Sequence, residues 1–260
     1  MGSTAPSALS GALRFAAYAY PPNALGYCGP DESRQLLEQV AAGVDDPDLR
    51  RLARGFEGAW PYLELIAGAN GIRDPLDERV VEAYWLGNGL LDRVGARLLG
   101  DSLETRFRGR AGRSWPRLVD AVPAGAVPHH SFHVFGVYPW VGLLREGRVD
   151  EPLHVLDRCR VRWGQVVEVR GARAVVSTRP LCWDGRRLLL GTARPEEVLL
   201  RDDGLGLAGP VQVGDWCSLH WDWVCERLDR AQLSALVRYT ARQLAVANST
   251  AYPAPAAVLA

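Results

Sequence analysis

The spacing of apolar residues changes along this chain from a helical period to a strand period near residue 155. Before that point, apolar side chains recur every three or four residues, as on one face of a helix. After it, short segments alternate apolar and polar residues and are separated by turns that contain glycine. A chain with this order folds as a helical part followed by a sheet, so we expect an α+β protein.

Three helical segments are predicted in the first half. The first follows Asp31, which can cap a helix. The second runs from Asp46 to Ile66 and the third from Asp74 to Leu98, and in both a proline follows the aspartate. Proline is tolerated at the first position of a helix, so it marks where these helices begin.

The second half predicts a small β-barrel that is closed on itself. A hairpin is expected from Cys159 to Arg179, turning at Gly171 and Ala172. Further strands are expected at 187–190, 197–200 and 216–220, and a helix at 229–247. We divide the chain into a mainly helical domain at 1–150, a barrel with its C-terminal helix at 151–248, and a flexible tail at 249–260.

The composition excludes several kinds of chemistry. All 30 basic residues are arginine, so a Schiff-base lysine or a phosphate-loop lysine is impossible. The net charge of zero gives no electrostatic reason to bind nucleic acid or an anionic membrane. The first 25 residues lack the pattern of a signal peptide, and no apolar run has the length of a membrane helix. With five cysteines and no C-x-x-C pair, we expect a cytoplasmic protein with free thiols.

Three of the five histidines lie within five residues, at His129, His130 and His133. On a helix, His129 and His133 would lie one turn apart, a spacing found in metal sites. On a strand, His129, Ser131 and His133 would share a face instead. The cluster therefore predicts either metal ligands or histidines that organise the junction between the two halves.

A second candidate site joins residues that are distant in the sequence. Cys159 is expected at the start of the first strand and His220 at the end of the last strand. These two ends can meet in a small barrel. A thiolate and an imidazole brought together form a site suited to iron, zinc or nickel.

The segment from Cys159 to Val246 resembles the HypC/HupF/HoxL family of small hydrogenase-assembly chaperones. In that family a cysteine begins the pattern C-x-x-x-P-G-x-V-x-x-V, and residues 159–169 keep its spacing with Trp163 in place of the proline. The family's last strand reads V-G-D-x-V-x-x-H, which residues 213–220 match with Cys217 in place of the second valine. The following helix of the family begins near a Leu-Asp pair, present here as Leu228 and Asp229.

The resemblance implies an OB-like barrel that carries the iron precursor of the nickel–iron hydrogenase active site, an iron ion with carbon monoxide and cyanide ligands. Cys159 would ligate the iron and dock to partners, with His220 as a nearby ligand or a proton-handling group. The implied partners are the hydrogenase large subunit and other hydrogenase maturation proteins. On this interpretation the protein is a chaperone that carries a metal centre and is not an enzyme.

Other residues of the barrel have expected places around this site. We expect Trp163, Trp221 and Trp223 to take part with Cys159 in docking a partner. Asp215 and Cys28 are expected beside the metal ligands, although an aspartate after a glycine is also a common turn residue.

Two other functions remain open. The first is a metal-dependent enzyme that uses His129, His130 and His133, for example to make a small ligand for the same pathway. The second is an OB-fold that stacks single-stranded nucleic acid on its tryptophans. The neutral charge of the chain argues against the nucleic-acid function, because such binding rests on a basic groove.

Overall fold

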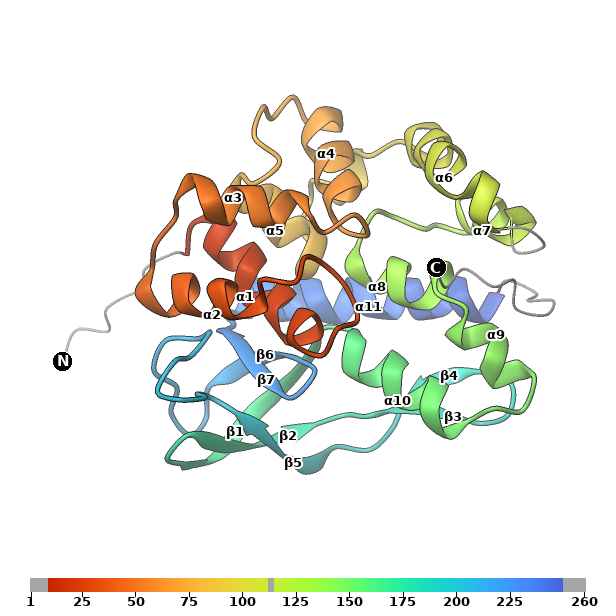
Figure 1. Cartoon of the computed structure of the whole chain (residues 1–260). Coiled ribbons are helices and arrows are strands. Elements are labelled where there is room, and N and C mark those ends of the chain that lie inside the picture. The colour runs from red at the N-terminus through yellow and green to blue at the C-terminus, as the bar shows by residue number, and fades with distance from the viewer. Residues whose placement is uncertain (1–8, 112–114, 250–260) are drawn as a thin grey trace.

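The computed structural model of this protein describes residues 9–111 and 115–249. Helices make up the N-terminal half, strands lie in the C-terminal half, and a last helix follows them, which confirms the expected α+β class. In Figure 1 the first helices form an upper layer, the strands form a lower layer, and α11 runs between them. Of the tail expected at 249–260, Ser249 ends α11 and the other residues lie outside the described ones.

The N-terminal layer contains a central helix, α1, and further helices around it. Their bounds are α1 Gly11–Ala24, α2 Ser33–Ala42, α3 Pro47–Arg54, α4 Trp60–Ala69, α5 Glu78–Trp85, a 3-10 turn at Leu91–Arg93, α6 Ala96–Ala111 and α7 Trp115–Ala121. The long helices expected at 46–66 and 74–98 are each split. The first is interrupted after Arg54 and the second after Trp85, and in each case a glycine follows within two residues.

Helix α1 was not predicted from the sequence, although it lies at the centre of the protein. Nearly every residue of α1 is buried, including both prolines at its C-terminal end. A helix that is apolar on all sides shows no amphipathic period, so the spacing of its residues carries no helical signal. The side chain of Ser10 caps α1 by accepting a hydrogen bond from the backbone nitrogen of Leu13 at 3.3 Å.

Four short helical segments connect the helical layer to the barrel. They are α8 His130–Phe132, a π-helical turn η3 at His133–Val137, α9 Trp140–Arg145 and α10 Asp150–Cys159. The histidine cluster is therefore helical and not extended. Cys159 is the last residue of α10, so the expectation that it begins a strand was wrong. Its neighbours Pro152, Val155 and Leu156 are buried with it, as one face of a helix requires.

The barrel consists of five strands in the closed order β1-β2-β5-β7-β6. Their bounds are β1 Arg162–Arg170, β2 Arg173–Thr178, β5 Arg194–Leu199, β6 Trp216–His220 and β7 Trp223–Arg227. A separate two-stranded sheet pairs β3 Leu181–Trp183 with β4 Leu188–Leu190. The β1-β2 hairpin and β6 lie where the sequence predicts them, whereas β3 and β7 were not predicted. The final helix, α11, spans Arg230–Ser249.

One hydrophobic core joins the two halves of the chain. Phe15 and Trp85 of the helical layer belong to the same buried cluster as Trp223 of β7 and Leu236 of α11. Helix α1 also contacts β6 and β7 directly. The boundary expected near residue 150 is therefore crossed by continuous packing.

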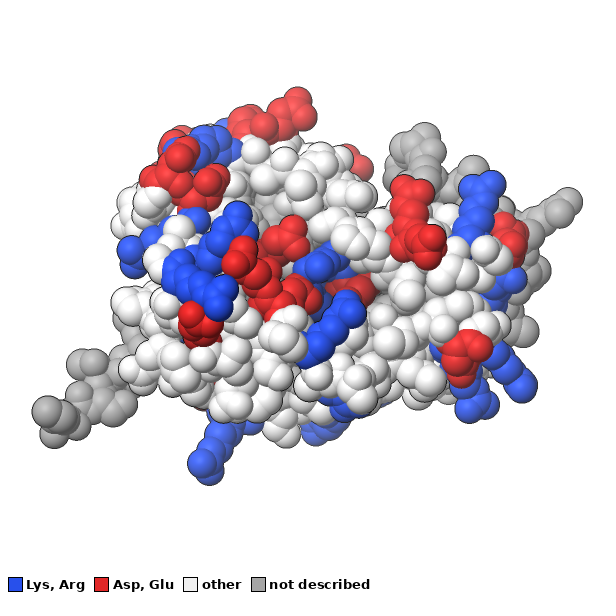
Figure 2. All heavy atoms as spheres, turned by 90° about the horizontal axis from the view of Figure 1, so that it is seen from below, with Lys and Arg blue, Asp and Glu red and all other residues white. Residues whose placement is uncertain are grey.

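Charged side chains are mixed on the surface. Figure 2 shows acidic and basic groups interspersed on the face seen from below. On the barrel, Arg170 pairs with Glu168 at 2.6 Å and Arg173 with Glu197 at 3.0 Å. Across residues 9–111 and 115–249, none of the helices has both the length and the apolar character needed to cross a membrane.

Candidate metal centre

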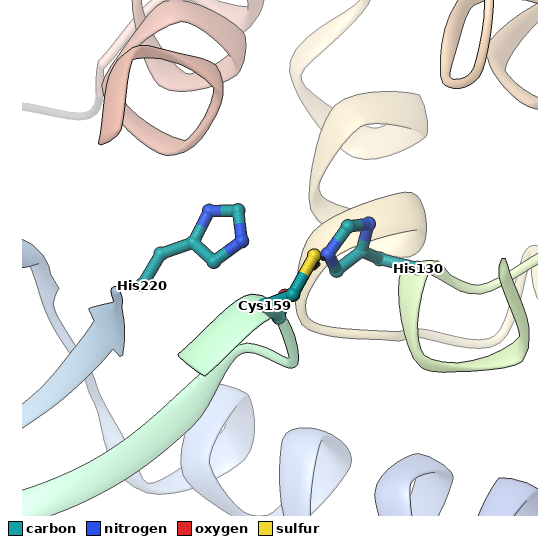
Figure 3. Close-up of side chains that lie close together, drawn as sticks. All are labelled: His130, Cys159 and His220. Atoms are coloured by element: carbon teal, nitrogen blue, oxygen red, sulfur yellow. Dashed lines mark hydrogen bonds between the residues drawn. The ribbon is translucent and has the colours of Figure 1, made fainter. Parts of the chain in front are cut away.

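Three predicted ligands, His130, Cys159 and His220, converge in the interior of the protein. Their ligand atoms all lie within 4.8 Å of one another, and all three residues are buried. Figure 3 shows the two imidazole rings on either side of the Cys159 side chain, with both rings turned toward it. Residues that are 29 and 61 positions apart in the sequence thus form one cluster.

Each ligand stands at the end of a secondary-structure element. His130 begins α8, Cys159 ends α10 and His220 ends β6. The short helix α8 is capped by His129, whose Nδ1 accepts a hydrogen bond from the backbone nitrogen of Ser131 at 3.1 Å. The connecting helices and the barrel therefore both contribute donors to the cluster.

Hydrogen bonds to backbone carbonyls hold both histidine rings in place. Nε2 of His130 lies 2.7 Å from the carbonyl oxygen of Cys159, and Nδ1 of His220 lies 2.6 Å from that of Tyr18. A ring nitrogen facing a carbonyl must carry the proton, so each ring donates. In His220 this is the arrangement common in metal-binding histidines, whose second ring nitrogen donates to a carbonyl while the other binds the ion.

The other ring nitrogen of His220 is free to bind a ligand. Its Nε2 is buried and has no hydrogen-bond partner among the described residues. Because Nδ1 holds the proton, Nε2 carries a lone pair. A buried acceptor without a partner is costly, and a metal ion would satisfy it.

Burial keeps the three side chains neutral in the absence of a metal. It lowers the pKa of His220 to about 4 and that of His130 well below its usual range. Burial also raises the pKa of the Cys159 thiol, and a charge on Cys28 would raise it further. A bound divalent metal ion would instead lower the pKa of the Cys159 thiol, because it stabilises the thiolate and displaces the thiol proton.

Aromatic rings form a wall of the cluster. The ring of Trp85 lies 4.6 Å from that of His130 and 5.6 Å from that of His220. Tyr18 stacks on Trp85 at 5.4 Å, which places its ring behind this wall. Tyr84 directs its hydroxyl oxygen at Nδ1 of His130, 3.3 Å away. None of Tyr18, Tyr84 and Trp85 was predicted from the sequence as part of the site.

The donor set fits a transition-metal ion. Thiolate and imidazole together suit iron(II) and zinc. Donors bound to one ion at roughly 2.0–2.3 Å lie about 3–4 Å apart, so movements of about an ångström would bring these atoms into ligand positions. Ligation through Nε2 of His130 would move its proton to Nδ1, where the Tyr84 oxygen can accept the hydrogen bond.

The other two histidines of the 129–133 segment point elsewhere. His129 stacks on Tyr239 of α11 at 5.8 Å. His133 lies against Tyr138 at 4.6 Å, and its Nδ1 is 3.4 Å from the hydroxyl oxygen of Tyr62. Within the described residues, only His130 of this segment shares a possible metal group with other ligands.

Asp215 and Cys28 have different relations to the cluster. Asp215 lies before the first residue of β6, at the end of the strand opposite His220. Its carboxylate accepts a hydrogen bond from the backbone nitrogen of Gln212 at 3.0 Å, as in a turn. Cys28 is half-buried in the loop after α1, and a charge on it would raise the pKa of the Cys159 thiol.

The predicted docking tryptophans lie mainly inside the protein. Trp221 stacks on Tyr27 of the helical half at 4.4 Å, and Trp223 packs edge-on against Tyr20 at 5.4 Å. Both are buried, whereas Trp163 is half-buried. In this chain, Trp221 and Trp223 attach the barrel to its own helical layer.

Comparison with known proteins identifies a family without an assigned activity. The model of one protein family, described as a family of unknown function (DUF6390), matches residues 7–254. No curated protein and no solved structure matches the chain. Since the matched segment includes the whole helical layer, the cluster and the barrel, the chain belongs to the DUF6390 family of unknown function.

Proposed function

We propose that this protein binds a transition-metal ion through His130, Cys159 and His220 and acts as a metal-centre carrier in the assembly of nickel–iron hydrogenase. The convergence of these three donors carries the metal-binding part of the proposal. The hydrogenase part rests on the resemblance of the barrel to the assembly chaperones, in which the residues matching Cys159 and His220 have this role. The cargo on this proposal is iron, with carbon monoxide and cyanide as its further ligands.

The helical half of the chain gives the proposed site a third donor and a cover. His130 comes from the helical half, and the carbonyl of Tyr18 in α1 orients His220. Trp85 covers the rings of both histidines. These contacts support a site that keeps a bound ion away from water, which suits the transport of an iron centre sensitive to oxygen and exchange.

Delivery of a buried ion requires the cover to open. The barrel is held to the helical layer by buried contacts such as that between Tyr18 and Ser218, whose hydroxyl oxygens lie 2.7 Å apart. We propose that a partner, the hydrogenase large subunit or another maturation protein, separates these surfaces and gains access to Cys159. All five cysteines are free thiols, which suits a cytoplasmic location.

A metal-dependent enzyme is the second candidate function. Three protein donors leave at least one ligand position for water or substrate, as in catalytic zinc sites. The enzyme would then use His130, Cys159 and His220, because His129 and His133 point away from this cluster.

Infrared spectroscopy tests the carrier proposal. The protein is purified anaerobically together with its bound partners, as wild type, as Cys159→Ala and as Cys182→Ala, which removes an exposed thiol on β3. We expect bands of iron-bound carbon monoxide and cyanide in wild type and Cys182→Ala and their loss in Cys159→Ala. Bands that are absent from wild type, or that survive in Cys159→Ala, contradict the carrier function.

A further inference from the structure

A stacked pair of aromatic rings lies at the surface beside the metal cluster. Tyr27 belongs to the loop between α1 and α2, which in Figure 1, in red, reaches from the helical layer toward α10. Its ring stacks on the ring of Trp221, with 4.4 Å between the two centroids. Tyr27 is 49% exposed and Trp221 only 4%. Tyr27 is therefore the outer ring of the pair, and it covers Trp221.

Trp221 is linked to two of the three proposed ligands. It directly follows His220, and its backbone nitrogen donates to the carbonyl oxygen of Arg158 at 2.9 Å, one residue before Cys159. The side chains of Trp221 and Cys159 also belong to the same buried apolar cluster. Cys159 is 9% exposed, the highest fraction among the three ligands. A movement of Trp221 would therefore uncover the thiol that already lies nearest to the surface.

The closed position of Trp221 has two costs. The residue occupies the first position of the two-residue turn between β6 and β7, and its φ is +52°. Glycine is usual at such a position, and a bulky residue is unfavourable there. The indole nitrogen of Trp221 is also buried without a hydrogen-bond partner among the described residues. Water would satisfy this nitrogen if the ring moved outward, so the closed position depends on what holds the ring.

The loop that carries Tyr27 is bonded to its own half of the chain. The backbone nitrogen of Tyr27 donates to the carbonyl oxygen of Pro22 at 3.0 Å. The side-chain nitrogen of Asn23 donates to the carbonyl oxygen of Cys28 at 2.7 Å. For the described part of the chain, no hydrogen bond or ion pair joins residues 25–30 to a strand of the barrel. Rotation of the exposed Tyr27 ring about its Cα–Cβ bond breaks none of these bonds and is fast.

From these contacts we infer that Tyr27 and Trp221 form an aromatic gate over Cys159, and that the Tyr27 ring keeps the gate closed. When this ring swings into water, Trp221 follows and Cys159 becomes accessible before the barrel and the helical layer separate. The opening of the gate sets the rate at which a metal ion enters or leaves the cluster. This use of the gate rests on the proposed function, whereas its effect on the Cys159 thiol needs no metal.

Alkylation of the cysteines by iodoacetamide in metal-free protein tests the aromatic gate. The labelling rate of each cysteine is measured by peptide mass spectrometry in wild type, Tyr27→Ala and Tyr27→Phe. The rate at a buried thiol follows the population of its open state, so Tyr27→Ala should label Cys159 roughly tenfold faster than wild type. Tyr27→Phe keeps the stacked ring and should label at the wild-type rate. Equal rates at Cys159 in all three proteins, or equally fast labelling in both variants, overturn the inference.

The labelling of Cys225 distinguishes the gate from a general opening of the protein. This thiol is buried in β7, within the core that joins the barrel to the helical layer, so separation of the two exposes it. Its rate in Tyr27→Ala should equal that in wild type. A rise at Cys225 together with Cys159 would show that Tyr27 supports the whole interface, which also overturns the inference.

A second variant acts on the inner ring of the gate. Glycine fits the positive φ of Trp221 and removes its ring, so Trp221→Gly should label Cys159 at least as fast as Tyr27→Ala does. Labelling at the wild-type rate would exclude Trp221 as the cover of Cys159. A separate titration of wild type with cobalt(II) tests metal binding. Protein that binds no cobalt(II) but shows the expected labelling would contradict the proposed function and leave the gate in place.

Discussion

The backbone carbonyl oxygen of Cys159 accepts a hydrogen bond from Nε2 of His130 at 2.7 Å. This bond ties the C-terminal end of α10 to the start of α8 and fixes two of the three proposed ligands relative to each other. His220 is held separately, by the carbonyl of Tyr18. The positions of the donors are therefore set by the fold before any metal binds, which reduces the cost of ordering them on binding.

Removal of the Tyr84 hydroxyl should weaken metal binding. When Nε2 of His130 binds the metal ion, the ring proton moves to Nδ1, where the Tyr84 oxygen accepts its hydrogen bond. Tyr84→Phe removes this acceptor. We expect roughly a tenfold to hundredfold loss of affinity, the usual effect of removing a group that orients a ligand. A competition titration with a metal chelator measures it. Tyr20→Phe is the control, because Tyr20 packs against Trp223; equal affinities of the two variants would contradict the role of Tyr84.

The protein should lose stability in mild acid. Burial lowers the pKa of His129 and His133 to about 3, that of His220 to about 4, and that of His130 well below its usual range. Below about pH 6.5 the unfolded chain binds protons at these rings and the folded protein does not, so unfolding takes up protons. Each ring then lowers the free energy of unfolding by about 2 kcal/mol at pH 5.

The three rings with a pKa of about 3 or 4 together lower that free energy by about 6 kcal/mol, a large part of the whole stability of an ordinary domain. Denaturant titrations between pH 7 and pH 4 should show stability falling across this window and lost near its acidic end. His154 is exposed, so His154→Gln should follow the wild-type curve. A free energy of unfolding that is constant from pH 7 to pH 5 would show that the rings are not buried as neutral groups.

Arg14 and Glu226 form a buried ion pair that should matter for stability. Nη2 of Arg14 lies 2.9 Å from the carboxylate of Glu226, which also accepts a hydrogen bond from Tyr18 at 3.1 Å. Arg14→Met leaves a buried carboxylate unpaired and should lower the free energy of unfolding by about 3–5 kcal/mol. Adding Glu226→Gln should restore part of the loss, because the unpaired charge is removed.

The exposed pair of Arg34 and Glu38 provides the comparison for that prediction. Arg34→Met should change the free energy of unfolding by less than about 1 kcal/mol, since exposed pairs contribute little. Chemical denaturation of the three variants measures both effects. A cost of Arg14→Met as small as that of Arg34→Met would mean that the buried pair does not hold α1 to the barrel.

Gly87 should be intolerant of any side chain. Its φ is +91°, and a Cβ there would lie 2.1 Å from the ring of Tyr239 in α11. The backbone strain and the overlap together should cost about 2–5 kcal/mol in Gly87→Ala. Gly89 has nothing within 4 Å of a Cβ and a φ outside the left-handed region, so Gly89→Ala should be nearly neutral. Thermal unfolding compares the two, and similar transition temperatures would contradict the close packing of α11 on this turn.

The sequence predicted those elements whose residues alternate in environment. Strand β2 of the predicted hairpin was found because residues on a half-buried strand follow a period of two. Helix α1 was missed because it is apolar on every side, and the helix that ends at Cys159 was missed although Pro152, Val155, Leu156 and Cys159 follow helical spacing. In that second case the helical spacing was present in the sequence, but the strand was predicted to begin at Cys159, which is too early in the chain.

The candidate site shows a different limit. The sequence singled out His130, Cys159 and His220 as ligand types, but in two separate clusters. Their convergence depends on α1. The carbonyl of Tyr18 in α1 orients His220, and Trp85 lies in α5, which packs against α1. Contacts between segments this far apart come from tertiary packing, which local spacing does not encode.

An anaerobic titration with cobalt(II) tests whether His130, Cys159 and His220 bind one metal ion. Cobalt(II) bound to a thiolate has an intense near-ultraviolet absorption band, so the titration reports both the number of ions and the presence of the sulfur ligand. We predict one ion per chain with this band in wild type and in Cys182→Ser, no band in Cys159→Ser, and weakened binding in His130→Asn and His220→Asn. Wild-type protein without the band, or a Cys159→Ser variant that keeps it, would show that Cys159 is not a ligand of such an ion.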